Sequence, residues 1–364
     1  MSFFKRYNPG VEWSDEGEVT LPIGSEPPLF EVYPSLCVSC LGEVGIDGYC
    51  VQCGQKAKSL RDHYEQSPTS WMAGVCDIGL IHVRNEDALA LQGDEKRGVM
   101  VVCDGVTTSD NSDVASMAAA RAAREVLWTT NPKGTGTPSS RAAVIEATLV
   151  RAVEAANQAV VGHTDPDSMS PAASTIAFAV IDAKMIACAN LGDSRVYWLP
   201  DDGEPICASR DHSLAQDGID AGAKRAEAEA SSFAHTITKW LGRDAVDLDP
   251  YTNLIAIETP GWLIVCSDGL WNYVSEAVDF AQLVQTCLAE DSTPAGLATR
   301  LVNWANEQGG HDNITAACAR IEVPDQLELP AEADPEAETE REIQSDNADS
   351  LVETDSFETT TPNE

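Results

Sequence analysis

The chain has 364 residues and a formal net charge of −36 at pH 7. Its length accommodates one large domain with smaller accessory segments, and its charge argues against nucleic acid or an anionic membrane as a partner, because like charges repel. No stretch of about 18 apolar residues occurs and the N-terminus has no apolar leader, so we expect a cytoplasmic protein outside the membrane.

Residues 1–35 are rich in proline, glycine and acidic side chains and have weak periodicity. This composition predicts an extended arm or linker. A compact cysteine segment follows at residues 36–56. The other seven cysteines of the chain stand singly, mostly in apolar runs, and are expected to be reduced core residues of a cytosolic protein.

The cysteine segment contains two C-x2-C pairs, Cys37 with Cys40 and Cys50 with Cys53, separated by nine residues that include three glycines. Each pair presents two thiolates to one ion, and four thiolates make a closed tetrahedral site. The pattern predicts a zinc-ribbon-like module with one structural Zn²⁺, which would supply the folding energy of so short a segment. The alternative, disulfide pairing, is disfavoured in a protein that is not exported.

From about residue 70 to 323, short apolar runs bounded by Asp or Gly alternate with segments of helical periodicity. The turn at 181–184 predicts a hairpin and therefore antiparallel pairing. The mixture indicates an α+β fold in which helices cover antiparallel sheets. Strands are expected at 99–103, 175–181, 185–190, 195–199, 262–266 and 315–321, and helices at 112–128, 139–161 and 294–308.

Carboxylates stand directly after several of these strands. Asp104-Gly105 and Asp268-Gly269 follow two buried strands, Asp193 follows a third, and Asp312 lies between a helix and a strand. Carboxylates at strand ends share one rim of a sheet assembly and can converge there, and such oxygen ligands suit Mg²⁺ or Mn²⁺ better than zinc. A single Asp-Gly pair is more often a plain turn, so the prediction depends on the combination.

These motifs resemble the PPM (protein phosphatase 2C-like) family of metal-dependent serine/threonine phosphatases. The resemblance spans about residues 72–322 and implies a four-layer αββα sandwich of two antiparallel sheets flanked by helices, with a binuclear metal centre at one end. The motifs, in the family's order and approximate spacing, are NED at 85–87, DG at 104–105, GDSR at 192–195, SDGL at 267–270 and GGHDN at 309–313.

The resemblance implies hydrolysis of phosphoserine and phosphothreonine in proteins, opposing a serine/threonine kinase. Two Mg²⁺ or Mn²⁺ ions would activate the attacking water and clamp the phosphoryl oxygens. So many carboxylates can be ionised together only when cations neutralise them. By resemblance the ligands are Glu86 and the Gly105 carbonyl for one ion, Asp268 and Asp312 for the other, Asp104 for both, and Asp193 with Asp268 for a weaker third ion.

The chain departs from the family's pattern near the phosphate. Members commonly have an arginine where this chain has His82. Strand alternation would put His82, Arg84 and Glu86 on one face, so Arg84 would hold the phosphate with protonated His82 assisting; the alternative is that His82 only packs at the rim. Val106 stands where many members have a proton-donating histidine, which leaves a metal-bound water or His212, more often structural, as the donor.

Two further segments have open roles. Residues 217–232 predict a polar, alanine-rich helical insert at the position of the family's variable flap, either gating substrate or simply solvated. Residues 324–364 are acidic, with Arg341 as their one basic residue, and predict a disordered tail. The zinc module and the tail are candidate docking sites for proteins, and the tail alternatively serves only to keep the chain in solution.

Two functions remain open at this point. Intact Asp104, Asp268 and Asp312 favour a phosphatase. His82 and Val106 favour a catalytically weak or inactive pseudophosphatase that binds phosphoproteins as a regulatory module. Substrate identity and oligomeric state are not readable from the sequence.

Overall fold

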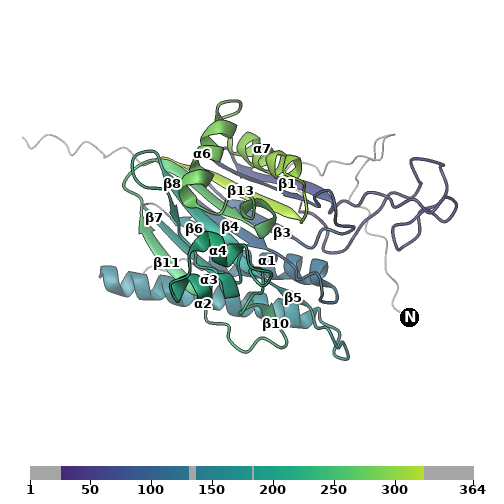
Figure 1. Ribbon diagram of the computed structural model, residues 1–364, viewed down its shortest axis with the longest axis horizontal. Coiled ribbons are helices and arrows are strands. Elements are labelled where there is room, and N and C mark those ends of the chain that lie inside the picture. Colours follow the sequence, from purple (N-terminus) through teal and green to yellow (C-terminus); the bar gives the residue numbers. More distant parts are fainter. Residues whose placement is uncertain (1–25, 131–136, 183, 324–364) are drawn as a thin grey trace, which may run out of the picture. The chain divides into compact units, whose positions relative to one another are not determined.

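Two antiparallel sheets lie face to face, and helices cover their outer faces (Figure 1). The structure, a computed structural model, describes residues 26–130, 137–182 and 184–323. All of the described residues belong to one compact structural unit, which spans residues 1–323. The acidic tail expected at 324–364 and most of the arm expected at 1–35 lie outside the described residues.

One sheet has six strands, each antiparallel to its neighbours. The last strand, β13, lies between β2 and β12, which places the loop before β13 and the loops after β2 and β12 along one rim. Strand β1 joins the sheet ahead of residue 70, so the sheet begins earlier than the sequence indicated. The order is β1 (His63–Thr69), β2 (Met72–Asp77), β13 (Ile314–Ile321), β12 (Gly261–Cys266), β8 (Arg195–Pro200) and β9 (Ile206–Cys207).

The second sheet has five strands, also antiparallel. Its β6–β7 hairpin pairs Asp182 with Met185 and confirms the turn expected at 181–184. A two-stranded ribbon, β5 (Ala173–Ser174) with β10 (Leu241–Gly242), lies apart from both sheets. The order of the five strands is β11 (Tyr251–Ala256), β7 (Met185–Leu191), β6 (Ile176–Asp182), β4 (Arg97–Cys103) and β3 (Ala88–Gly93).

Helices α1 (Ser112–Thr129) and α2 (Pro138–Gly162) cover the five-stranded sheet, and α6 (Ala277–Leu288) and α7 (Pro294–Glu307) cover the six-stranded sheet (Figure 1). Local sequence sets the start of α7, where the Thr293 hydroxyl accepts from the Gly296 N–H. The four-layer αββα arrangement is confirmed, although α6 was not predicted.

The residues expected to form one helical insert at 217–232 instead form two short helices, α3 (Leu214–Asp220) and α4 (Arg225–Glu229). Gly222, between them, has a φ of 100°, a left-handed conformation that favours glycine and interrupts the helix. A single helical turn, α5 (Asp268–Trp271), follows β12.

The main core lies between the two sheets and under α1 and α2. The residues of strand β4 from Gly98 to Cys103 are buried because both faces of the strand are covered. This burial explains why the sequence of the strand is continuously apolar. A second core joins α6 and α7 to the outer face of the six-stranded sheet, where Phe280 stacks on Tyr197 with ring centroids 4.3 Å apart.

The cysteine segment is held by three isolated β-bridges and a small core of Cys37, Val44 and Cys50. All eleven cysteines are unpaired. Cys207 is exposed, so its expected burial is wrong, whereas the other six single cysteines are buried. Among the described residues, no helix has both the length and the apolar character needed to cross a membrane.

Candidate active site

Asp104 follows β4 directly, beside the short strand β5. Its backbone carbonyl accepts hydrogen bonds from the Thr175 N–H at 2.7 Å and from the Ser174 hydroxyl at 2.9 Å. Gly105 has no room for a side chain, because a Cβ there would lie 2.7 Å from the Glu86 carbonyl oxygen. The end of the strand therefore holds Asp104 on a fixed backbone next to Glu86.

Asp268 and Asp312 come from adjacent strands of the other sheet. Asp268 follows β12 and begins α5, and Asp312 precedes β13, with Cys266 paired to Ala316 across the two strands. A Cβ on Gly269 would lie 2.0 Å from the Asn313 carbonyl oxygen. Glycine after Asp268 is therefore required by the close approach of the two loops, and the Asp-Gly pair is more than a plain turn here.

Asn313 connects this rim to the loop before β3. Its side-chain oxygen accepts from the Glu86 N–H at 2.8 Å, and its side-chain nitrogen donates to the carbonyls of Ile78 at 2.8 Å and Arg84 at 3.2 Å. The residue belongs to the GGHDN motif, but its anchoring role was missed because its partners lie far away in the sequence.

The rim carboxylates are Asp104, Asp193, Asp268 and Asp312, and burial together with their mutual repulsion raises the pKa of the first three. Burial raises the pKa of Asp104 well above its usual range, and Asp87 and Asp268 raise it further. Burial and then Asp312 raise the pKa of Asp268 to about 6. Burial, followed by the charge of Asp268, also raises the pKa of Asp193 well above its usual range. Full ionisation of this group is therefore unfavourable unless cations neutralise it.

The donor set fits a hard divalent cation. Asp268 Oδ2 accepts from Asn272 at 3.1 Å, whereas its Oδ1 is buried and accepts no hydrogen bond from the described residues. A buried carboxylate oxygen without a partner is costly, and Mg²⁺ and Mn²⁺ bind such oxygens. No three of the rim carboxylates among the described residues bring their oxygens within 4.8 Å of one another.

Arg84 and Glu86 lie together, as the sequence suggested, but not on a strand. Residues 82–87 form a loop before β3, so the expected strand alternation is wrong. Arg84 lies 3.0 Å from Glu86 Oε1 and 3.5 Å from Asp113 Oδ1. Burial lowers the pKa of Arg84, but the negative charges of Asp113 and Glu86 outweigh burial and raise that pKa above its usual value. Asp113, at the start of α1, was missed because no local motif marks it.

His82 points to a different partner. Its Nε2 lies 3.3 Å from Asp312 Oδ1, so His82 and Arg84 contact different carboxylates. His212 is buried, and its Nδ1 accepts from the Gly192 N–H at 3.3 Å. Burial, with Lys239 and Arg210, lowers the pKa of His212 to about 4. His212 is therefore neutral near pH 7 and is a poor proton donor for a leaving group.

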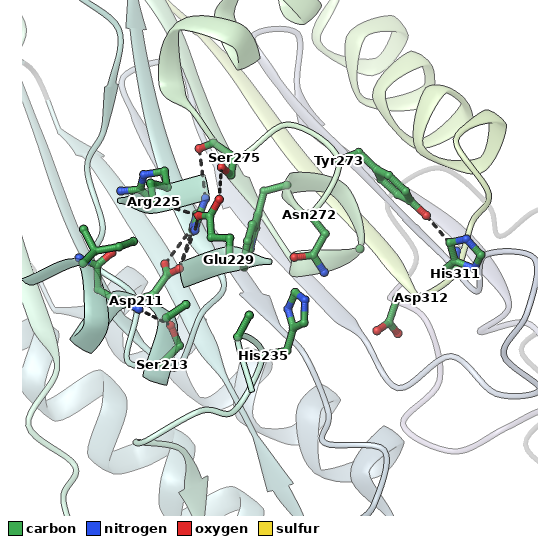
Figure 2. A pocket seen from close by; sticks show the side chains of 17 residues that line it. Asp211, Ser213, Arg225, Glu229, His235, Asn272, Tyr273, Ser275, His311 and Asp312 are labelled. Atoms are coloured by element: carbon green, nitrogen blue, oxygen red, sulfur yellow. Dashed lines mark hydrogen bonds and ion pairs between the residues drawn. The ribbon is translucent and has the colours of Figure 1, made fainter. Parts of the chain in front are cut away.

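A cavity of about 280 Å³ adjoins the rim (Figure 2). Asp312 and His311 line one end of it, and Arg225 and Glu229 of α4 line the other (Figure 2). His235 projects between these ends toward Asn272 (Figure 2). The insert therefore lines a cavity beside the carboxylates instead of being a solvated helix without contacts.

Buried Arg195 anchors the insert to the sheet. Its guanidinium lies 2.7 Å from Asp211, 3.4 Å from Glu229 and 3.5 Å from the centroid of the Trp271 ring. Glu229 also accepts from the Ser275 hydroxyl at 2.7 Å. These contacts fix α4 against the six-stranded sheet and so fix one wall of the cavity.

The four cysteines of the N-terminal segment form a separate cluster. Their sulfur atoms all lie within 4.8 Å of one another, with Cys37 and Cys53 at 3.7 Å and Cys40 and Cys50 at 3.4 Å. Four sulfurs bound to one zinc at about 2.3 Å stand roughly 3.8 Å apart at the corners of a tetrahedron. Backbone N–H groups of Cys53 and Gln52 outweigh burial and lower the pKa of Cys50 to about 6, which favours the thiolate.

Comparisons with known proteins agree with this geometry. The family model described as "Protein phosphatase 2C" matches residues 82–306. The chain is 28% identical over 243 residues to a serine/threonine phosphatase stp of Listeria innocua, covering 66% of this chain and 91% of that protein. The cysteine segment lies outside the residues that the family model matches.

Solved structures give the same result. The crystal structure of the serine/threonine phosphatase PstP/Ppp of Mycobacterium tuberculosis superposes with a TM-score of 0.57 and 26% identity, covering 69% of this chain and 98% of that one. A serine/threonine phosphatase of S. agalactiae has a TM-score of 0.58 and 24% identity, covering 69% of this chain and 100% of that chain. At this identity the likeness shows only that the fold is shared. The family match, the rim of carboxylates and the αββα layers together place this chain in the protein phosphatase 2C family of serine/threonine phosphatases.

Proposed function

We propose that this chain hydrolyses phosphoserine and phosphothreonine in proteins with the help of Mg²⁺ or Mn²⁺. The observation that carries the proposal is a rim of half-buried carboxylates from both sheets, where burial and neighbouring charges raise the pKa of Asp104 and Asp268, and where Asp268 keeps one oxygen without a hydrogen-bond partner among the described residues. When bound, divalent cations lower the pKa of the attacking water and neutralise the phosphoryl oxygens. A kinase that phosphorylates serine and threonine would supply the substrates.

In this proposal the residues of the rim and of the loop before β3 have separate roles in binding cations and phosphate. Glu86, Asp104 and the Gly105 carbonyl would hold one cation, Asp104, Asp268 and Asp312 would hold the second, and Asp193 with Asp268 would hold a weaker third. Arg84 holds the substrate phosphate from the loop before β3, where Asp113 and Glu86 orient its guanidinium. His82 contributes less, because its Nε2 faces Asp312.

We also propose that Cys37, Cys40, Cys50 and Cys53 bind one structural Zn²⁺, since their sulfur separations match a tetrahedral site. The proposed domains are the arm 1–35, the zinc module 36–56, the phosphatase domain 70–323, extended toward the N-terminus by β1, and the acidic tail 324–364. The eleven unpaired thiols suit the reducing cytoplasm. Protein docking through the zinc module or the tail belongs to the same proposal.

Phosphate release from a phosphothreonine peptide tests the main proposal. Release should require added Mn²⁺ or Mg²⁺ and should stop in excess chelator, because the carboxylates repel the negatively charged phosphate unless bound cations neutralise both. The second candidate is a pseudophosphatase, favoured by the His82–Asp312 pair and by Val106. Tight binding of the phosphopeptide without release at saturating Mn²⁺ would support that candidate.

The role of Arg84 gives a separate prediction. Arg84→Ala should raise KM for the phosphopeptide roughly 10- to 100-fold, because a charge-assisted contact to phosphate contributes on the order of 1.5 to 3 kcal/mol. Arg300→Ala, which removes the same charge from α7, is the matched control and should leave KM unchanged. A silent Arg84→Ala together with a damaging His82→Ala would show that histidine has replaced arginine in holding the phosphate.

A further inference from the structure

The cysteine module contacts the loop that carries His82 and Arg84. Lys56 follows Cys53 by three residues, and its amine donates a hydrogen bond to the Val83 carbonyl. Val83 lies between His82 and Arg84 in the chain. The contact thus joins a segment outside the family-matched residues to the part of the proposed active site where this chain departs from its family.

The fold of the module sets the position of Lys56. Lys56 forms a β-bridge with Tyr49, the residue before Cys50. The next residue, Ala57, donates from its N–H to the Gly48 carbonyl at 2.8 Å. Lys56 therefore keeps its place only while the second cysteine pair is folded, and a segment this short depends on its metal for folding.

The two ends of the loop are held by other contacts. At one end, the Leu80 N–H donates to the Gly310 carbonyl at 2.9 Å. At the other, the guanidinium of fully buried Arg61 donates to the Asp87 carbonyl at 3.1 Å, and the Arg61 backbone carbonyl accepts from the Asn85 side chain at 2.9 Å. These contacts fix where the loop begins and ends, and beside Val83 the Arg84 carbonyl accepts from the Asn313 side chain at 3.2 Å.

The middle of the loop has little packing of its own. Leu80, Ile81 and Val83 are 65%, 63% and 69% exposed. Exposed apolar side chains bury too little surface to order a backbone, so such segments open readily. A hydrogen bond from a charged amine to the Val83 carbonyl therefore adds to the Asn313 contact at Arg84 in holding this stretch.

We propose that the metal-bound cysteine module positions the phosphate-binding loop, with Lys56 as the positioning residue that holds the Val83 carbonyl and thereby orients Arg84. This inference rests on the proposed phosphatase function for its kinetic consequence. Lys56 itself does not touch substrate. Its removal affects capture of the phosphate more than the chemical step, because Asp104, Asp268 and Asp312 stand at strand ends and the Glu86 N–H is held separately by Asn313.

Kinetics of the full-length protein test the proposal. Lys56→Ala should raise KM for a phosphothreonine peptide roughly five- to tenfold at saturating Mn²⁺ and change kcat less than about twofold. Lys56→Arg should restore KM, because a guanidinium also donates to a carbonyl. Lys96→Ala, an exposed lysine in the β3–β4 turn, is the matched control and should behave as wild type. An unchanged KM in Lys56→Ala would overturn the proposal.

Hydrogen exchange gives a readout that does not need activity. Amides of residues 79–87 should exchange faster in Lys56→Ala and in the double variant Cys37→Ser plus Cys53→Ser than in wild type, while β12 and β13 exchange at wild-type rates. Equal exchange of 79–87 in all three proteins would overturn the proposal even if the protein is an active phosphatase. Conversely, faster exchange in a protein without phosphatase activity would support the positioning role and refute the proposed function alone.

Discussion

Asp104→Asn or Asp268→Asn is expected to lower the Mn²⁺-dependent rate of phosphopeptide hydrolysis on the order of 10³-fold. Each substitution removes one ligand charge and keeps the size of the side chain. Asp104 would bind both proposed cations, and Asp268 has the buried Oδ1 without a hydrogen-bond partner among the described residues. Steady-state kinetics of the purified variants at several Mn²⁺ concentrations would measure the loss.

The same variants should keep or gain stability when no metal is present. The pKa of Asp268 is raised to about 6 in the folded chain, above its value of about 3.9 when unfolded. Such a group contributes stability that is present below pH 4 and lost as the pH rises through 6, so an uncharged asparagine avoids this loss at pH 7. A melting temperature at or above that of metal-free wild type is therefore expected.

These outcomes separate a catalytic role from a structural one. Asp279→Asn, which changes an exposed carboxylate on α6, is the matched control and should retain full activity. Near-wild-type rates in Asp104→Asn or Asp268→Asn would refute the assignment of the metal ligands. A large drop in melting temperature would instead show that the carboxylates are needed for the fold.

Purified protein is expected to contain about one equivalent of zinc, and the double variant Cys37→Ser plus Cys53→Ser is expected to contain none. The two substitutions remove one thiolate from each C-x2-C pair and leave only two sulfurs for the ion. Binding of a structural zinc provides roughly 10 to 16 kcal/mol in short cysteine-rich segments. Its loss should therefore unfold residues 36–56, and elemental analysis with limited proteolysis would detect both changes.

Cys207→Ser is the matched control for this experiment, because Cys207 is an exposed thiol outside the cluster. It should retain one equivalent of zinc and resist proteolysis as wild type does. Zinc content that stays the same in the double variant would refute the proposed site. Resistance of residues 36–56 to proteolysis without zinc would show that the segment folds on its β-bridges alone.

Local sequence determined much of the fold. The apolar runs at 99–103, 185–190 and 262–266 are strands in the structure because they are buried on both faces, and such burial requires continuous apolar sequence. Helix α7 begins at its Thr293 cap, as a local hydrogen bond dictates. The Asp-Gly pairs were readable for the same reason, since Asp104 follows β4 directly and Asp268 follows β12 after one residue.

The segments that the sequence did not reveal have weaker local signals. Strand β11 lies at a sheet edge with partly exposed side chains, so no continuous apolar run marks it. A strand would place His82, Arg84 and Glu86 on one face, but these residues form a loop, in which the Asn313 side chain bonds to the Glu86 N–H and the Arg84 carbonyl. The tertiary contact overrides the local pattern there.

Only the tertiary structure decided which residues meet at the rim. The Glu86 N–H bonds to the Asn313 side chain, although the two residues are 227 residues apart in the chain. Arg84 pairs with Asp113, which lies on helix α1. Lys56 reaches Val83 from a module that belongs to neither sheet. The carboxylates and cysteines stand in short motifs, so the sequence alone identified them. The partners that orient Arg84 come from distant segments, and their contacts depend on tertiary packing that no local pattern predicts.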